Sequence, residues 1–203
     1  IGRDQELIEI AQQLSKKDCR LLTLHGMGGI GKSRLAIQGA YDQLKGKQFN
    51  DGVYFVTLDA LTSAELIPSS IAEALSLELQ GQEDTLSQVK RFISKKHLLL
   101  LLDNYEHLMA GATLTGKLLE ACPNLKLLVT SRERLNVEEE WVLTLDGLAV
   151  PTLAELSEAE RFDALHLFVQ RAKRAILEFS LTQETLPHAL KICQLVEGSP
   201  LGI

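Results

Sequence analysis

Short apolar runs alternate along the chain with longer stretches in which apolar residues recur every three or four positions. The apolar runs predict five β-strands, because they have the length of strands and are rich in leucine and β-branched residues. They cover residues 20–25, 52–58, 97–103, 125–131 and 140–145. Strands that are apolar along their whole length are buried on both faces, which favours a parallel sheet between two layers of helices.

Helical periodicity fills the intervals between these runs. Leu7, Ile10 and Leu14, for example, share one face of the first predicted helix. The predicted helices cover residues 4–17, 32–44, about 64–79, 86–95 and 105–120. The alternation of strands with helices predicts a three-layer α/β domain.

The pattern changes after Leu145. Gly147 and Pro151 interrupt the chain, and the periodic segments beyond them, residues 157–175 and 184–198, are helical. We therefore expect an α/β domain over residues 1–147, followed by the start of a small helical domain over residues 148–203. The chain lacks an initial methionine and stops at what resembles a helix start, so we expect it to be part of a longer protein.

The composition narrows the classes of partner. A net charge of −6 argues against a nucleic-acid surface on this part of the protein, because phosphate backbones bind clustered lysine and arginine. The longest wholly apolar run, residues 98–102, is far too short to cross a membrane. Three widely spaced cysteines form no metal-binding pattern and predict reduced thiols in a cytoplasmic protein.

The glycine-rich segment after the first predicted strand satisfies two phosphate-binding fingerprints. Gly26, Gly28 and Gly31 have the G-x-G-x-x-G spacing of dinucleotide-binding folds. Gly26, Gly31, Lys32 and Ser33 also have the G-x-x-x-x-G-K-[ST] spacing of a phosphate loop. The two fingerprints imply different ligands, so the rest of the chain must distinguish them.

The phosphate-loop interpretation explains more residues. A dinucleotide site would use an acidic residue after the second strand, and Asp59 is available for it. It leaves Lys32 and Ser33 unexplained, whereas a phosphate loop needs an ammonium for the β- and γ-phosphates and a hydroxyl for Mg²⁺. The backbone N–H groups of residues 28–33 would bind the phosphates at a helix N-terminus.

Asp103 supplies a second element of a nucleotide site. It ends an apolar strand, and the carboxyl edge of a parallel sheet is where ligands bind and where a carboxylate can hold Mg²⁺. Asp103 or Asn104 could instead cap the helix that follows. The phosphate loop upstream favours the Mg²⁺ role.

A third element is the segment Thr130, Ser131 and Arg132, at the end of the fourth predicted strand. It would deliver a hydroxyl and a guanidinium toward the γ-phosphate, where the arginine could detect that phosphate. The alternative is an arginine in a surface turn, paired with Glu133 or Glu138.

Six segments carry a resemblance to a known family. "IGRDQEL", "GMGGIGKSRLA", "LLLLLDNYEHL", "LLVTSRERL", "WVLTLDGL" and "GSPLGI" resemble, in order and spacing, the nucleotide-binding core of the STAND class of P-loop ATPases. The resemblance is greatest to the NB-ARC-like ATPases of bacterial regulators. It implies a P-loop NTPase fold with a five-stranded parallel sheet of order 5-1-4-3-2, followed by a helical domain.

The resemblance also implies roles for individual residues. The implied nucleotide-binding residues are Arg3, Gly26, Gly28, Gly29, Ile30, Gly31, Lys32, Ser33, Arg34 and Pro200. Ser33 and Asp103, the Walker B aspartate, would hold Mg²⁺. Arg132 would be the sensor of the γ-phosphate, Arg3 would lie beside the adenine, and Pro200 would pack against the base.

One position departs from the family pattern. Many relatives have a second acidic residue directly after the Walker B aspartate, and here that position is Asn104, which is no base. Glu106 could act as the base, or it could merely complement the helix dipole. We therefore expect slow hydrolysis, with Lys32, Asp103, Arg132 and Glu106 as the candidate catalytic residues.

The expected function is a regulatory switch that binds ATP and ADP, hydrolyses ATP slowly with Mg²⁺, and controls signalling or transcription. Its output would be self-association or release of an effector domain, with no direct nucleic-acid or membrane contact by this part of the protein. One alternative is a P-loop enzyme that transfers phosphate to a small-molecule acceptor. A dinucleotide-dependent oxidoreductase is the weakest alternative.

Overall fold

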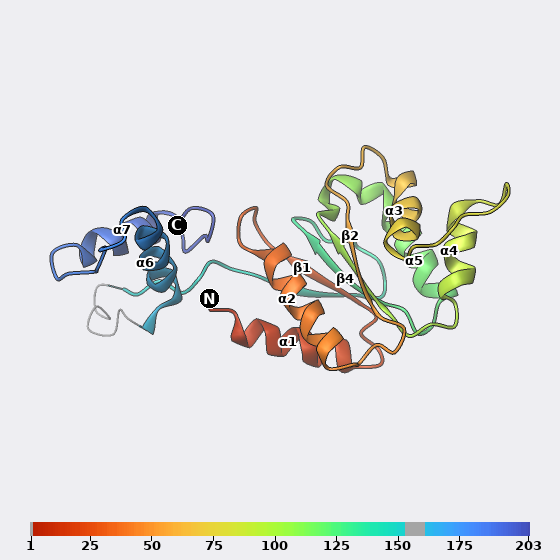
Figure 1. Ribbon diagram of the computed structural model, residues 1–203, viewed down its shortest axis with the longest axis horizontal. Coiled ribbons are helices and arrows are strands. Elements are labelled where there is room, and N and C mark those ends of the chain that lie inside the picture. The colour runs from red at the N-terminus through yellow and green to blue at the C-terminus, as the bar shows by residue number, and fades with distance from the viewer. Residues whose placement is uncertain (1, 153–160) are drawn as a thin grey trace. The chain divides into compact units, whose positions relative to one another are not determined.

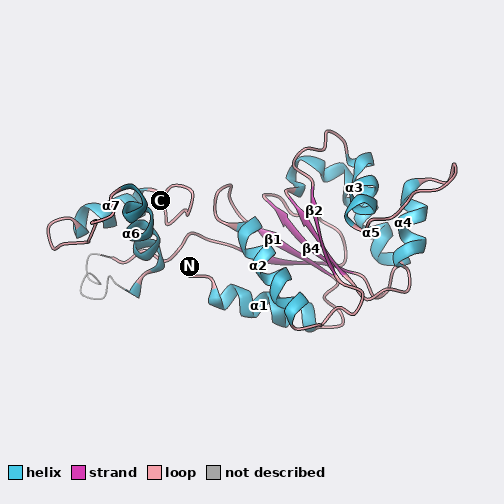
Figure 2. Cartoon of the chain, in the orientation of Figure 1, coloured by secondary structure: helices cyan, strands magenta, loops and turns pink. Residues whose placement is uncertain are grey.

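The computed structural model describes residues 2–152 and 161–203 (Figures 1 and 2). Contacts divide the chain into two units. The first, called here the sheet unit, contains Gln5–Gly26 and Lys32–Thr144. The second, called the helical unit, contains the loop Met27–Gly31 together with the first residues of the chain and those from Leu145 onward. The predicted domain division at residues 147 and 148 stays a prediction.

The sheet unit is built on five parallel strands in the order β2-β3-β4-β1-β5. The strands are β1 Leu21–His25, β2 Val53–Thr57, β3 Leu99–Asp103, β4 Lys126–Ser131 and β5 Glu140–Thr144. Both the five-stranded parallel sheet and its order are therefore confirmed, the order 5-1-4-3-2 being the same sheet read from its other edge. All five residues of β3 and all six of β4 are buried, as their apolar runs predict.

Helices cover both faces of this sheet (Figure 1). Within the sheet unit the helices are α1 Asp4–Ser15, α2 Lys32–Lys45, α3 Ile67–Ala74, α4 Thr85–Ile93 and α5 Ala112–Ala121, with 3₁₀ segments η1 Ala64–Leu66 and η2 Tyr105–Gly111. Leu100 and Leu102 of β3 belong to a core shared with α3, α4 and α5. Leu101, which points to the other face, lies beside α2. The three-layer arrangement is thus confirmed.

The predicted helix over residues 105–120 is wrong in its first half. Residues Tyr105–Gly111 form the 3₁₀ segment η2, which has a non-helical kink at Leu108. The buried hydroxyls of Tyr105 and Thr115 lie 2.8 Å apart. Ten residues of continuous α-helix would separate their backbones by about 15 Å, beyond the reach of the two side chains. The hydrogen bond therefore requires the break.

The predicted helix over residues 64–79 is too long. It starts as the 3₁₀ turn η1, and α3 ends at Ala74. The N–H of Leu77 donates to the carbonyl of Ala72, and the N–H of Ser76 donates to that of Glu73. This is a Schellman ending, with Ser76 at a φ of 50° in the place where glycine is usual. The sequence therefore contained no glycine signal for the helix end.

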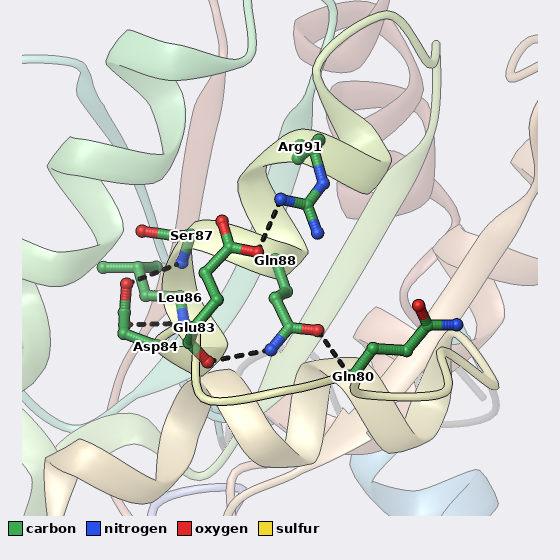
Figure 3. Close-up of polar contacts among 7 residues, drawn as sticks. All are labelled: Gln80, Glu83, Asp84, Leu86, Ser87, Gln88 and Arg91. Atoms are coloured by element: carbon green, nitrogen blue, oxygen red, sulfur yellow. Dashed lines mark hydrogen bonds and ion pairs between the residues drawn. The ribbon is translucent and has the colours of Figure 1, made fainter.

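Gln88 closes the loop between α3 and α4, which Figure 3 shows in close-up. Its buried side-chain amide donates to the carbonyl of Glu83 at 2.8 Å, and its amide oxygen accepts from the N–H of Gln80 at 2.8 Å. Asp84 caps α4 by accepting from the N–H groups of Leu86 and Ser87. One buried side chain thus holds the second half of the loop against the start of α4.

The helical unit contains α6 Asp163–Ala175 and α7 Leu186–Leu195, which pack together through Ala164, Leu165, Ala189 and Cys193. The start of the predicted helix over residues 157–175 lies partly outside the described residues. Gly198 has a φ of 66°, and its carbonyl accepts from the N–H of Leu148 at 2.9 Å. In the described residues we find no helix with the length and apolar character needed to cross a membrane.

Replacing Gln88 by leucine is expected to lower the free energy of unfolding by about 1–2 kcal/mol, because the N–H of Gln80 and the carbonyl of Glu83 lose their partner. Urea denaturation followed by circular dichroism measures this. Gln82→Leu, an exposed position in the same loop, is the control and should have little effect. Equal stabilities of the two variants would contradict the role given to Gln88.

Candidate functional site

Part of the predicted phosphate loop belongs to the helical unit. Gly29 and Gly31 have φ values of 79° and 98°, which glycine adopts without strain. The carbonyl of Gly29 accepts from the N–H of Leu201 at 3.2 Å. A Cβ at Gly29 would lie 2.6 Å from the Leu201 side chain, so this position excludes larger residues on two grounds.

Arg3 joins the same unit. Its guanidinium donates to the carbonyl of Asp146 at 2.6 Å and to that of Ile30 at 3.4 Å. Pro200 is the neighbour that a Cβ at Gly31 would meet, at 4.0 Å. The structure therefore brings together Arg3, Ile30, Gly31 and Pro200, four residues that the resemblance places around a nucleotide. Their contact with a nucleotide stays a prediction.

In the sheet unit, Lys32 is the first residue of α2 and has an exposed fraction of only 7%. Its ammonium donates to the carbonyl of Gly26 at 2.8 Å. Burial lowers the pKa of Lys32, and the carboxylates of Glu106 and Asp103 oppose this shift. Lysine is thus held at the start of the helix among acidic groups.

Ser33 and Arg34 follow Lys32 in α2. Ser33 is half-buried, while the side chain of Arg34 is exposed. The role of Ser33 in binding Mg²⁺ and that of Arg34 in binding the nucleotide stay predictions.

Asp103 ends β3 and is buried. One oxygen of its carboxylate accepts from the hydroxyl of Thr130 at 2.5 Å. That hydroxyl also accepts from the N–H of Asn104 at 3.0 Å, and Asn104 has left-handed backbone angles. The single bond to Thr130 uses only one of the two carboxylate oxygens of Asp103, which suits a group that would hold a cation through the other.

Thr130 contacts Asp103 directly, which the sequence did not predict. Its hydroxyl is fully buried and bonded to Asp103. That the segment of residues 130–132 delivers a hydroxyl toward a γ-phosphate stays a prediction. The contact with Asp103 could have been predicted from strand register. Leu102 of β3 pairs with Val129 of β4, so the next residues, Asp103 and Thr130, also lie opposite each other. Register depends on sheet order, which short motifs do not contain.

Arg132 and Glu106 form an ion pair, with 2.9 Å between Nε of the arginine and Oε1 of the glutamate. The side chain of Arg132 is 62% exposed and that of Glu106 is 19% exposed. The other oxygen of Glu106 is buried and has no hydrogen-bond partner among the described residues. The sequence offered Glu133 and Glu138 as partners of Arg132, but the ion pair in the structure is with Glu106.

Among the described residues, no group of three or more histidine, cysteine, aspartate or glutamate side chains could hold a metal ion. A tightly caged metal is therefore not built from these side chains. Mg²⁺ at a phosphate site commonly has one or two protein ligands and takes the others from phosphates and water. A buried aspartate with one engaged oxygen fits that kind of site.

The chain matches the NB-ARC domain over residues 3–172. A protein of Mycobacterium tuberculosis named as a candidate HTH-type transcriptional regulator is 36% identical over 185 residues, covering 91% of this chain and 19% of that protein. An uncharacterised protein of the same organism is 34% identical over 205 residues, covering 100% of this chain and 48% of its own length. The chain thus spans less than half the length of these curated relatives.

Two solved structures show the same fold at low sequence identity. A Signal Transduction ATPase with Numerous Domains (STAND) protein with a tetratricopeptide repeat sensor, from Pyrococcus horikoshii, is 21% identical with a TM-score of 0.53, covering 98% of this chain and 28% of its own. Cdc6p from Pyrobaculum aerophilum is 16% identical with a TM-score of 0.66, covering 98% of this chain and 58% of its own. These likenesses support the P-loop NTPase fold.

The match to the family extends from the first residues, through the phosphate-loop segment and both charged strand ends, into α6. The chain therefore belongs to the NB-ARC domain family.

Proposed function

We propose that this chain is a regulatory nucleotide switch that binds ATP and ADP, with Mg²⁺ as cofactor, and hydrolyses ATP slowly. The observation that carries the proposal is the grouping of charges in the sheet unit. Lys32, Asp103, Glu106 and Arg132 come from three separate parts of the sequence, and Lys32 lies within electrostatic reach of the other three. One further cation and two carboxylates around a phosphate-loop lysine suit a nucleoside triphosphate with a divalent cation.

Each side chain has a distinct task in this proposal. The Lys32 ammonium would bind the β- and γ-phosphates in place of the carbonyl of Gly26, to which it now donates. The Arg132 guanidinium is well suited to a phosphate, because its donors form a planar fork. Bound Mg²⁺ would neutralise phosphate charge, with Asp103 and Ser33 as its ligands from the protein.

Slow hydrolysis follows from the shortage of a free base. Asn104 carries an amide directly after Asp103, and an amide can orient water but cannot take its proton. Glu106 is the nearest substitute in sequence, but its carboxylate is engaged by Arg132. A long-lived bound nucleotide suits a switch better than a turnover enzyme.

The relatives support a regulatory output. The M. tuberculosis relative is named as a candidate HTH-type transcriptional regulator, and this chain aligns with only 19% of it. The STAND structure from P. horikoshii has a tetratricopeptide repeat sensor. We propose that this chain is likewise the nucleotide-binding part of a regulator, in which self-association or effector release and any DNA contact depend on other domains.

Transfer of phosphate to a small acceptor is a second possibility in principle, but no observation favours it.

Replacing Lys32 by alanine is expected to weaken ATP and ADP binding at least tenfold, because the phosphates lose their ammonium partner. Isothermal titration with each nucleotide and Mg²⁺ measures both affinities. Lys45→Ala is the matched control, since Lys45 is an exposed lysine at the other end of the same helix. Unchanged binding by Lys32→Ala would refute a phosphate-loop site.

Replacing Thr130 by valine is expected to raise at least fivefold the Mg²⁺ concentration that half-saturates ATP binding, because Asp103 loses the hydroxyl that orients it. Thr130→Ser keeps the hydroxyl and should restore the wild-type value. ADP binding without Mg²⁺ should be alike in all three proteins, and thermal melting checks that they are folded. If valine and serine give the same Mg²⁺ dependence, Thr130 does not act through Asp103.

A further inference from the structure

Glu106 is engaged by the same arginine that is expected to detect the γ-phosphate. One carboxylate oxygen accepts from Nε of Arg132 at 2.9 Å. The glutamate side chain is mostly buried, at 19% exposure, so its negative charge is poorly hydrated. Its second oxygen is buried without a hydrogen-bond partner among the described residues, so the arginine is the counter-charge that offsets this burial.

The surroundings of Glu106 extend this relationship to the phosphate-loop lysine. The carboxylate of Glu106 raises the pKa of Lys32 against the effect of burial, whereas Arg132 lowers it. Glu106 therefore interacts electrostatically with both cations, Lys32 and Arg132, that the proposed function gives to the γ-phosphate. Asp103 also acts on Lys32, but its carboxylate is bonded to Thr130.

A carboxylate and a terminal phosphate are alternative oxyanion partners for a guanidinium. When ADP is bound, no γ-phosphate competes for Arg132, and the pair with Glu106 can persist. When ATP is bound, its γ-phosphate can reach Arg132 only by displacing Glu106 or by sharing the arginine with it. Displacement breaks the ion pair, and sharing places the γ-phosphate beside a second negative charge, so both alternatives cost free energy with ATP and not with ADP. Only such a difference between ligands can shift the balance between two states.

We infer that Glu106 is a specificity-determining residue that favours ADP over ATP, by occupying Arg132 in the place of the γ-phosphate. This inference rests on the proposed function, because it presumes that adenine nucleotides bind here. It gives Glu106 a task other than that of a general base: the carboxylate is an internal competitor of the substrate. The device would keep the switch in its ADP-bound state until ATP is sufficiently in excess.

The expected effect is moderate. Arg132 is largely exposed, and exposed ion pairs contribute little because water and salt screen them. The burial of Glu106 strengthens the pair somewhat. We therefore expect a change of about fivefold in relative affinity, within the usual range for coupling between ligands.

The test is Glu106→Gln, which removes the charge and keeps the size and shape of the side chain. Dissociation constants for ADP and for a non-hydrolysable ATP analogue, both with Mg²⁺, are measured by isothermal titration. The ratio of the ATP-analogue constant to the ADP constant should fall about fivefold. Glu133→Gln is the matched control, because Glu133 is an exposed glutamate next to Arg132 in sequence, and it should leave the ratio unchanged.

A second background separates competition for Arg132 from a general effect of charge. Removing any nearby carboxylate could strengthen the binding of all phosphates, whether or not Arg132 is present. In the Arg132→Gln background, Glu106→Gln should therefore change the ratio much less than fivefold, since the contested arginine is gone and only the weaker effect of Glu106 on Lys32 remains. The same fall in both backgrounds would overturn the inference, and so would an unchanged ratio in Glu106→Gln alone.

The remaining outcomes are equally decisive. If Glu106→Gln abolishes ATP hydrolysis and leaves the affinity ratio unchanged, the residue is a base and the inference fails. If the unsubstituted chain binds neither ADP nor the ATP analogue, the proposed function itself fails. Intact binding of both ligands with an unchanged ratio overturns only the role given to Glu106. Thermal melting confirms that each variant is folded.

Discussion

The parallel register of β1, β3 and β4 is the constraint on which the candidate site depends. In a parallel sheet every strand ends at the same edge, so residues distant in sequence emerge as neighbours. The pairing of Leu102 with Val129 sets Asp103 beside Thr130, and β1 lies next to β4 with His25 opposite Ser131. A sheet order that did not place β3 beside β4 would separate Asp103 from Thr130 and Arg132.

The charges gathered at this edge are mutually dependent. Burial disfavours the ammonium of Lys32, and the carboxylates of Glu106 and Asp103 offset that cost only in part, since the pKa of Lys32 stays lowered. Asp103 is buried but hydrogen-bonded to Thr130, and Glu106 is mostly buried but paired with Arg132. Buried charges of this kind are held by partners that a ligand of matching charge can replace. An added phosphate would therefore compete with the carboxylates for Lys32 and Arg132 in the proposed site.

Much of the fold could be predicted from the sequence, and so could the grouping of Lys32, Asp103 and Arg132; their roles toward a nucleotide stay predictions. The apolar runs of β3 and β4 are buried on both faces, and such strands have few structural alternatives. The spacing of Gly26, Gly31 and Lys32 is that of a phosphate loop and is visible in the sequence itself. Residue types and spacing therefore sufficed for these features.

Features that depend on tertiary contacts could not be predicted from the sequence. The partner of Thr130 follows from register, and the partner of Arg132 follows from where η2 places Glu106. The spacing of apolar residues predicted a regular helix over η2, because that spacing contains no information about the hydrogen bond between Tyr105 and Thr115. Ser76 likewise ends α3 in a left-handed conformation, which is expected of glycine but not of serine.

The central claim is that the chain holds an adenine nucleotide and responds to its terminal phosphate. The most direct measurement is to denature the freshly purified protein and identify any released nucleotide by ion-exchange chromatography. We expect ADP to be released, or the protein to be free of nucleotide and to bind ADP and ATP when they are added with Mg²⁺. Released NAD(H), or a folded protein that binds NADH and neither adenosine phosphate, would contradict it.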